Sequence, residues 1–177
     1  MNIILCGLPM SGKSSIGKKL SKKLGLFFID IDQEIEKEYQ RLTKTAYTCR
    51  QIFMNEGEEF FRLLEKKQIA LLLGITNSVV ALGGGGLKDQ DNIDVLEKVG
   101  IIVYLKATPE ILWPRVEKRG LPAYVHREDP QKAFYALAKE RLPSYEAAAN
   151  VTIDTNHLTE KEVINCIVNH RRILHGK

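Results

Sequence analysis

Cysteine is scarce in this chain of 177 residues, with only Cys6, Cys49 and Cys166. The three lie far apart and form no C-x-x-C pair, which argues against a disulfide framework and against a zinc site. This pattern is typical of proteins in a reducing compartment, and we expect a cytoplasmic protein.

Long apolar runs are also missing. The run from Ile3 to Cys6 is far shorter than the roughly 20 residues that span a bilayer, and no basic segment precedes it as in a signal peptide. The sequence has no repeat and no low-complexity linker, and its length suits one compact domain over residues 1–177. We therefore expect a single domain with no membrane partner.

Positive charge is in only mild excess, with 26 Lys and Arg against 22 Asp and Glu. The basic residues are spread through helical stretches rather than interleaved with aromatic residues, as they would be in a nucleic-acid groove. We therefore expect an anionic small molecule as the partner and no nucleic acid. We also expect a monomer.

Short apolar runs alternate with amphipathic stretches along the chain. The runs predict strands at 2–6, 26–29, 79–82, 101–105 and 151–153. A helix is predicted from Lys13 to a stop at Gly25, and further helical patterns lie around Glu34, 60–73, Ile111, Phe134 and Val163. Strands that are apolar without a period of two are expected where helices cover both faces of a parallel sheet. The predicted fold class is therefore α/β, a three-layer α/β/α domain with about five strands.

A phosphate-binding loop is predicted at residues 7–14, which read G-L-P-M-S-G-K-S and match G-x-x-x-x-G-K-[ST] between a strand and a helix. Gly7 and Gly12 permit a tight turn whose N–H groups point inward, toward a phosphate at the helix N-terminus. Lys13 is placed to reach the β- and γ-phosphates of ATP, and Ser14 to ligate Mg²⁺. The alternative is a glycine-rich turn that happens to carry a lysine. The loop alone leaves open whether phosphate goes to water or to a second substrate.

Two carboxylates, Asp30 and Asp32, follow the second predicted strand. Ligands of parallel sheets lie at the carboxyl ends of the strands, so both residues are candidates for the site. Asp30 is placed for a Mg²⁺ contact, whereas Asp32 can orient an acceptor hydroxyl and take its proton. Alternatively, Asp32 is only the N-cap of the helix that follows.

Two arginines are candidate anion clamps. Arg62 lies in an acidic helix that opens at Glu56, and Glu65 at i+3 can hold its guanidinium. The simpler alternative for this pair is a solvated surface ion pair. Arg141, in the later segment R-L-P-S-Y-E-A-A-A, is the second candidate.

Two further segments are candidate parts of the site. Gly83–Gly86 follows a predicted strand, and its lack of side chains lets the backbone approach a ligand; a flexible loop is the alternative. Arg115 and Arg119 border a polar segment that predicts a mobile lid at about 116–130, with an ordinary connection as the alternative.

In their order along the chain these motifs resemble the shikimate kinase family of small P-loop kinases, from about the first residue to Asp154. The resemblance is carried by G-x-x-x-x-G-K-S at 7–14, D-x-D at 30–32, G-E-x-x-F-R-x-x-E at 57–65, the glycines at 83–85, and R-x-P-x-Y-x-x-x-A at 141–149. It implies a five-stranded parallel sheet, with a substrate-binding helical segment at about 31–65. It also implies transfer of the γ-phosphoryl group of ATP to the 3-hydroxyl of shikimate, with Mg²⁺, in aromatic amino acid biosynthesis.

The resemblance also implies roles for particular residues. Lys13, Asp32 and Arg119 would be catalytic, and Ser14 and Asp30 would serve the metal. Shikimate would be bound by Asp32, Arg62, Gly83, Gly84, Gly85 and Arg141, with the two arginines on its carboxylate. ATP would be bound by Met10, Ser11, Gly12, Lys13, Ser14, Ser15, Arg115 and Arg119, with Arg115 stacked near the adenine.

The sequence departs from the family pattern in two places. Two residues separate Arg119 from Pro122 in the lid, so that Arg127 is an alternative to Arg119 at the phosphates. The segment 39–50 is longer than the usual connection.

Two rival functions also remain open. The first is a related kinase acting on another small hydroxylated acceptor, such as gluconate or a nucleotide. The paired arginines favour a carboxylate over a neutral sugar, but either could serve a phosphate. The second is a non-catalytic nucleotide switch or ATPase subunit, although no apolar run is followed by the Asp-Glu pair of a strong ATPase.

Overall fold

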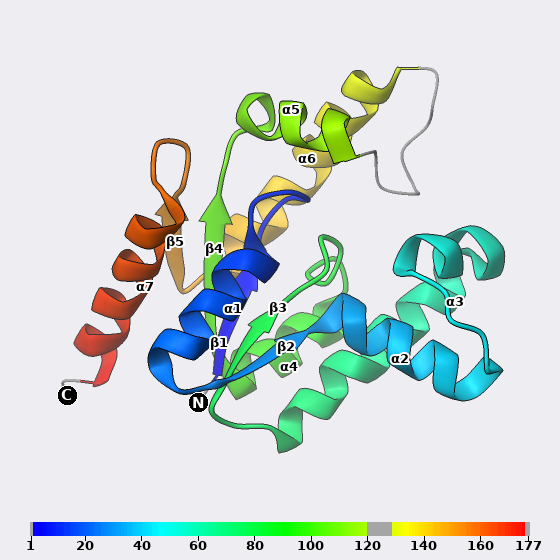
Figure 1. Ribbon diagram of the computed structural model, residues 1–177, viewed down its shortest axis with the longest axis horizontal. Helices are drawn as coiled ribbons and strands as arrows, with labels where there is room; N and C mark the ends of the chain where they lie inside the picture. Colours follow the sequence, from blue (N-terminus) through cyan, green and yellow to red (C-terminus); the bar gives the residue numbers. More distant parts are fainter. Residues whose placement is uncertain (1, 120–128, 176–177) are drawn as a thin grey trace.

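The computed structural model describes residues 2–119 and 129–175, with side chains described up to His170 in the last helix. Figure 1 shows the course of the chain. The strands are β1 (Asn2–Cys6), β2 (Phe27–Asp30), β3 (Ser78–Ala81), β4 (Gly100–Lys106) and β5 (Val151–Asp154). The helices are α1 (Lys13–Leu24), α2 (Ile31–Thr43), α3 (Cys49–Leu71), α4 (Gln90–Val99), α5 (Pro109–Arg119), α6 (Pro130–Ala148) and α7 (Glu160–His175), with a short 3-10 turn, η1 (Leu72–Gly74), after α3.

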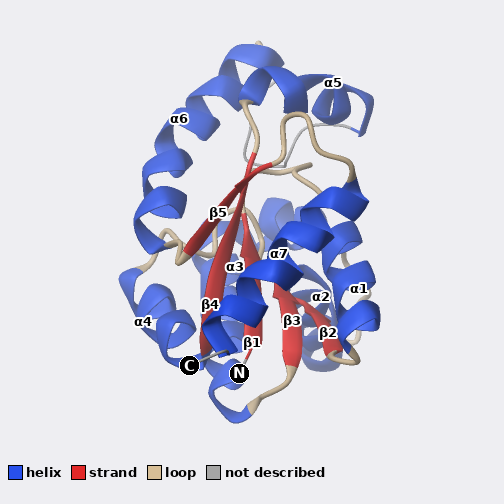
Figure 2. Cartoon of the chain, turned by 90° about the vertical axis from the view of Figure 1, so that its left-hand side faces the viewer, coloured by secondary structure: helices blue, strands red, loops and turns tan. Residues whose placement is uncertain are grey.

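The strands form one parallel sheet in the order β2-β3-β1-β4-β5. Figure 2 shows this sheet edge-on, with helices on both sides. The predicted three-layer α/β/α architecture with a five-stranded parallel sheet is thus confirmed, and each predicted strand lies within a residue or two of its expected place.

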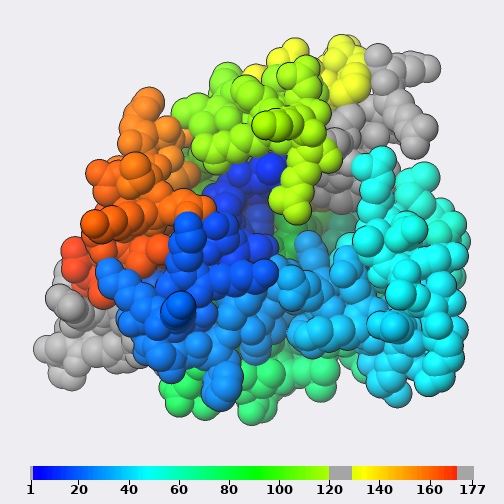
Figure 3. All heavy atoms as spheres, viewed as in Figure 1, coloured from blue at the N-terminus to red at the C-terminus, as the bar shows by residue number. Residues whose placement is uncertain are grey.

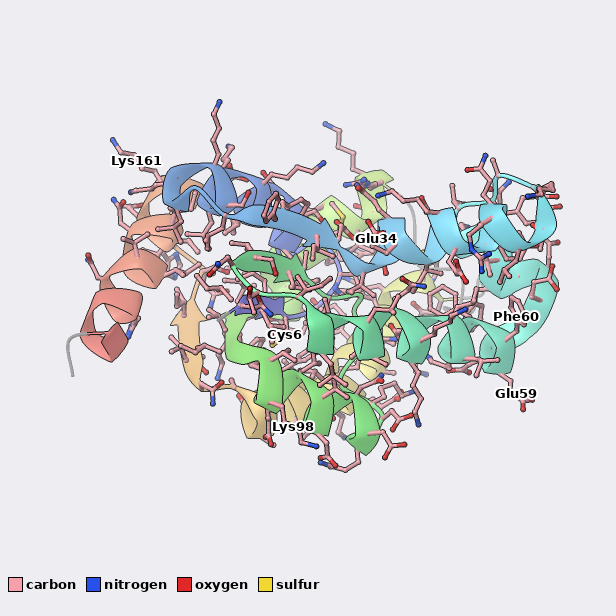
Figure 4. The ribbon with its side chains drawn as sticks, turned by 90° about the horizontal axis from the view of Figure 1, so that it is seen from below. Cys6, Glu34, Glu59, Phe60, Lys98 and Lys161 are labelled. Atoms are coloured by element: carbon pink, nitrogen blue, oxygen red, sulfur yellow. The ribbon has the colours of Figure 1, made fainter. Side chains whose placement is uncertain are left out.

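Each face of the sheet is covered by its own hydrophobic cluster. Successive residues of a strand pack into opposite clusters, because side chains alternate across a sheet. Ile3 and Leu5 of β1 pack with α1 and α7 on one side. Ile4 and Cys6 pack on the other side, in the larger cluster that α2, α3, α5 and α6 cover. Figure 4 shows Cys6 in the interior, whereas Glu59 points away from the molecule on α3. Both faces of β1 are therefore buried, which explains its unbroken apolar run.

Helix α4 was not predicted. It begins after Asp89, whose side chain accepts a hydrogen bond from Asp91 N, and it buries Leu96 against the sheet. The signal that could have revealed it is an Asp at the N-cap before an apolar pattern.

The acidic helix begins earlier than expected, at Cys49 rather than Glu56. Thr48 and Gln51 form a capping box there, with each side chain bonded to the other residue's backbone N–H. Gly57 has φ 85° and ψ 171°, so it breaks the helix into two parts close to the expected start. The segment 39–50 therefore comprises the end of α2, a short connection and the first turn of α3.

Within the ranges given above, no helix is long and apolar enough to cross a membrane.

Candidate active site

The phosphate loop joins β1 to α1 at the carboxyl end of the central strand. Gly7 has φ 143°, and a Cβ there would lie 2.7 Å from the carbonyl oxygen of Leu105. Gly12 has φ 91°, and Ile16 N makes the first helical hydrogen bond to its carbonyl oxygen. The N–H groups of Lys13, Ser14 and Ser15 therefore have no intrahelical acceptor, as at any helix N-terminus. Such a terminus is a site for a phosphate group.

The Lys13 ammonium group lies against the inside of this loop. Its Nζ donates to the carbonyl oxygens of Gly7 and Leu8, each at 2.9 Å. Burial lowers the pKa of Lys13 to about 8, while the nearby carboxylates of Asp32 and Asp30 oppose the shift. A phosphate group beside this lysine would favour its charged form.

Ser14 and Asp30 place two oxygen ligands together. Ser14 Oγ donates to Asp30 Oδ2 at 2.6 Å, and the Asp30 carboxylate is buried. Hard oxygen ligands of this kind suit Mg²⁺, which usually takes one or two protein groups and completes its shell with phosphates and water. Among the described residues no cluster of three or more His, Cys, Asp or Glu could hold a metal. The pair therefore fits an ion that arrives with a nucleotide.

Asp30 also caps α2, since its Oδ1 accepts a hydrogen bond from Asp32 N at 3.2 Å. The alternative reading of Asp32 as the N-cap is therefore wrong, and Asp32 lies inside the first turn of the helix. Burial raises the pKa of Asp32 to about 6, with Asp30 and Glu65 adding to the shift and Lys13 opposing it. A carboxylate with such a pKa is suited to accept a proton near neutral pH.

Arg62 is held by Glu65 as expected. Its Nη1 donates to Glu65 Oε2 at 2.6 Å, and Glu65 is only 1% exposed. The alternative of a solvated surface ion pair is therefore wrong. The Arg62 side chain keeps 25% of its surface exposed, so its free edge can still meet a ligand.

The glycines after β3 approach three of the predicted substrate residues. A Cβ on Gly83 would lie 2.6 Å from Asp32 Oδ1, and one on Gly84 would lie 2.7 Å from Arg141 Nη1. A Cβ on Gly85 would collide with the Arg62 guanidinium. Any side chain here would displace these groups, so the packing of the predicted site residues requires glycine at these positions. The approach of this backbone to a ligand stays a prediction.

One cavity of about 500 Å³ brings most of the predicted site together. From the phosphate loop and α1 come Met10, Gly12, Lys13, Ser14 and Ser15. From the acceptor side come Asp30, Asp32, Arg62 and Gly83–Gly85, and from the end of α5 comes Arg119. Figure 3 shows the surface hollowed between α5 and the α2–α3 segment, with the N-terminal residues at its floor.

Three predicted residues do not line this cavity. Ser11 is buried inside the loop, and its Oγ has no hydrogen-bond partner among the residues described. Arg115 lies over the loop, where its Nη1 donates to Met10 O at 3.4 Å. Arg141 is buried behind Gly84. Arg127 and the rest of 120–128, most of the predicted lid, lie outside the described residues.

The sequence analysis missed several residues of the cavity wall. Cys49, Arg50 and Phe53 come from the first turns of α3, where no helix was expected. The Thr48–Gln51 capping box is the signal that could have placed that helix. Pro9, Phe61 and Leu82 also line the cavity, as does Glu65, so an acceptor would meet apolar surface as well as charge.

Comparisons with known proteins agree with this geometry. A family model described as shikimate kinase matches residues 9–172. A shikimate kinase from Thermodesulfovibrio yellowstonii is 34% identical over 177 residues, covering 99% of this chain and 98% of that protein. Shikimate kinase 1 from Yersinia pestis is 39% identical over 169 residues, covering 95% and 94%. A structure of shikimate kinase from Acinetobacter baumannii in complex with shikimate matches with a TM-score of 0.89 at 32% identity, covering 99% of this chain and 95% of that one.

Proposed function

Because this chain belongs to the shikimate kinase family, we propose that it transfers the γ-phosphoryl group of ATP to the 3-hydroxyl of shikimate, giving shikimate 3-phosphate and ADP. The observation that carries the proposal is that Asp32 and Arg62 share one cavity with the phosphate loop. This supports a proton acceptor and an anion clamp that act in the same cavity as the loop proposed to hold the γ-phosphate. Neither a phosphate loop nor an anion clamp alone would specify a kinase of a small acid.

The acceptor is held from two sides in this proposal. Arg62 and Arg141 bind the shikimate carboxylate, and the N–H groups of Gly83–Gly85 face the ring. Guanidinium groups suit this role because they bind a carboxylate in fork geometry. Arg62 lines the cavity directly, whereas Arg141 lies next to it, with its Nη1 beside Gly84 of the cavity wall.

Asp32 orients the 3-hydroxyl and accepts its proton as the oxygen attacks the γ-phosphorus. The new O–P bond forms while the bond from the γ-phosphorus to the β-phosphate oxygen breaks, so that ADP leaves. Positioning and charge stabilisation are the main contributions of a protein to this reaction. The raised pKa of Asp32 fits a carboxylate that gains a proton in the reaction.

The donor side uses the phosphate loop. Lys13 and the free N–H groups at the start of α1 bind the phosphate oxygens, and Arg119 on the cavity wall adds positive charge at the γ-phosphate. Ser14 and Asp30 would hold Mg²⁺, whose chemistry is to neutralise charge between the phosphates. Arg115 lies over the loop at Met10, which is compatible with a place near the adenine.

The family assignment favours this reaction over the two rivals. Gluconate is an open-chain sugar acid whose carboxylate the arginines could also bind, and a nucleotide acceptor would need room for a base. Both compounds can be tested directly as acceptors. A non-catalytic switch would hydrolyse ATP without an acceptor, if at all.

A coupled assay for ADP release tests the proposal. With Mg-ATP we expect turnover that depends on shikimate, and little turnover with gluconate, nucleoside monophosphates or no acceptor. Asp32→Asn should lower kcat by roughly 10² to 10³, because it removes the proton acceptor and keeps the shape. Glu34→Gln, in the same turn of α2, is the control and should keep wild-type activity. Absence of shikimate-dependent turnover in the wild type would refute the proposal.

A further inference from the structure

The Tyr145 hydroxyl reaches across the fold to the acceptor site. Tyr145 lies in α6 and is 2% exposed, and its hydroxyl donates to the carbonyl oxygen of Gly84 at 2.5 Å. The two residues are 61 positions apart in the chain, so this hydrogen bond joins separate parts of the fold. This hydrogen bond is part-buried, and a carbonyl group that loses its donor away from water costs more than the net gain of an average hydrogen bond.

Gly84 lies where the two halves of the site meet. A Cβ on this residue would lie 2.7 Å from Nη1 of Arg141 and 3.4 Å from Cδ of Pro9 in the phosphate loop. Arg141 precedes Tyr145 by four residues on α6, so both project from the same face of that helix. Helix α6 thus contacts Gly84 twice, through the hydroxyl of Tyr145 and through the guanidinium of Arg141.

We propose that Tyr145 is a positioning residue for the acceptor, whose hydroxyl sets the place of the glycine loop relative to Arg141 and the phosphate loop. This inference rests on the proposed function. Gly83 and Gly85 flank Gly84 and approach Asp32 and Arg62, respectively. A shift of the loop would therefore move the groups proposed to bind the acceptor. Displacements of about 1 Å can cost a catalytic site roughly 10²-fold in rate.

The neighbouring tyrosine offers a matched comparison. Tyr104 of β4 is fully buried, and its ring centroid lies 5.4 Å from that of Tyr145 at an interplanar angle of 37°. Its hydroxyl has no hydrogen-bond partner among the residues that the structure describes. In this aromatic pair, the Tyr145 hydroxyl therefore anchors the loop, whereas the Tyr104 hydroxyl has no hydrogen bond to any described part of the chain.

The experiment compares Tyr145→Phe with Tyr104→Phe in the coupled assay. Each change removes one buried hydroxyl and keeps the ring contact, so both variants should fold, as checked by circular dichroism and thermal melting. We expect Tyr145→Phe to raise KM for shikimate about tenfold, with kcat within about threefold of wild type and KM for ATP unchanged. Tyr104→Phe should leave all three values unchanged.

Several outcomes would overturn the inference. One is a Tyr145→Phe variant that melts at lower temperature but keeps its KM for shikimate, since its role would then be structural. Another is an equal rise of KM in Tyr104→Phe, since any change to the aromatic pair would then suffice. Should Tyr145→Phe fail to fold, Gly84→Ala moves the same loop with the hydroxyl kept, and an unchanged KM there would also refute it. A wild type without shikimate-dependent turnover refutes the proposed function and this inference together, whereas the other outcomes leave the proposed function intact.

Discussion

Glu65 is buried one turn after Arg62 on α3 and accepts a 2.6 Å hydrogen bond from its Nη1. The carboxylate thereby turns the guanidinium toward Gly85 and the cavity instead of toward solvent. A charged group that is this deeply buried depends on its partner, because leaving either one unpaired is costly. The pair is therefore expected to affect both the acceptor site and the stability of the fold.

Glu65→Gln should reveal both effects, on the acceptor site through KM and on the fold through the free energy of unfolding. Glutamine keeps the shape but loses the charge that orients Arg62, so we expect KM for shikimate to rise about tenfold and the free energy of unfolding to fall by about 1–3 kcal/mol. The control is Glu58→Gln, since Glu58 Oε1 lies 3.5 Å from Arg62 Nε but its side chain is 57% exposed. An exposed pair contributes little, so this variant should behave as wild type. Equal effects of both changes would contradict the assignment.

The glycine loop allows a paired test of close approach. A Cβ at Gly85 would collide with the Arg62 guanidinium, whereas a Cβ at Gly86 would meet only ordinary contacts, the nearest at 3.5 Å from Gly83 O. Gly85→Ala should therefore raise KM for shikimate at least tenfold, and Gly86→Ala should change it less than threefold. Steady-state kinetics with shikimate as the varied substrate measure both. A Gly85→Ala enzyme with wild-type KM would show that Arg62 can move aside without loss.

Much of the site could be predicted because its signals are local in the sequence. The phosphate loop is defined by glycines and a lysine at fixed spacing between a strand and a helix, and Arg62 and Glu65 are one helical turn apart. Apolar runs and turn residues were enough for the parallel sheet, since the inner strands β1, β3 and β4 are largely buried. The edge strands β2 and β5 are more exposed, yet each still has a short apolar run.

The remaining features depend on packing between distant segments or on exact helix boundaries, which the spacing of residues along the chain does not predict. The hydrogen bond from Tyr145 to Gly84 and the approach of Arg141 to the same residue arise only when α6 packs beside β4 and reaches the loop after β3. The choice of Asp30 over Asp32 as the N-cap depends on where β2 ends and α2 begins, and an error of two residues in that boundary reverses it. The early start of α3 was missed because Gly57 interrupts its helical pattern.

The Cys49 thiol should react slowly although it lines the cavity. Its Sγ lies 3.2 Å from the carbonyl oxygen of Asp32, and burial together with the nearby carboxylates raises its pKa well above the usual range. A raised pKa lowers the thiolate fraction at any given pH, and the thiolate is the nucleophile. At pH 8 we expect iodoacetamide to modify Cys49 at least tenfold more slowly than in the chain unfolded with guanidinium chloride, with the rate still rising above pH 9. Peptide mass spectrometry follows the site, and equal rates in folded and unfolded chains at pH 8 would contradict the expectation.

Glu160 places a negative charge beside the phosphate loop. It begins α7 and accepts a 2.6 Å hydrogen bond from Ser15 Oγ, and it forms an ion pair with Lys19. Because Ser15 also lines the cavity, this carboxylate should repel the phosphates of a bound nucleotide. Glu160→Gln keeps an acceptor oxygen for Ser15 and removes the charge, so we expect it to lower the Kd for ADP about threefold at low salt. The side chain is 43% exposed, so the gain should shrink at 0.5 M salt, where the Debye length is only about 4 Å.

The matched control for Glu160 is Asn165→Ala. It removes a different hydrogen bond between α1 and α7, in which Lys23 Nζ donates to Asn165 Oδ1 at 2.7 Å, and Asn165 does not line the cavity. This variant should bind ADP with wild-type affinity in isothermal titration calorimetry at both salt concentrations. Weaker ADP binding in Glu160→Gln, or the same change in Asn165→Ala, would mean that Glu160 acts by holding the two helices together. An affinity gain confined to Glu160→Gln and reduced by salt is what the charge predicts, since a lost helix contact would not depend on ionic strength in this way.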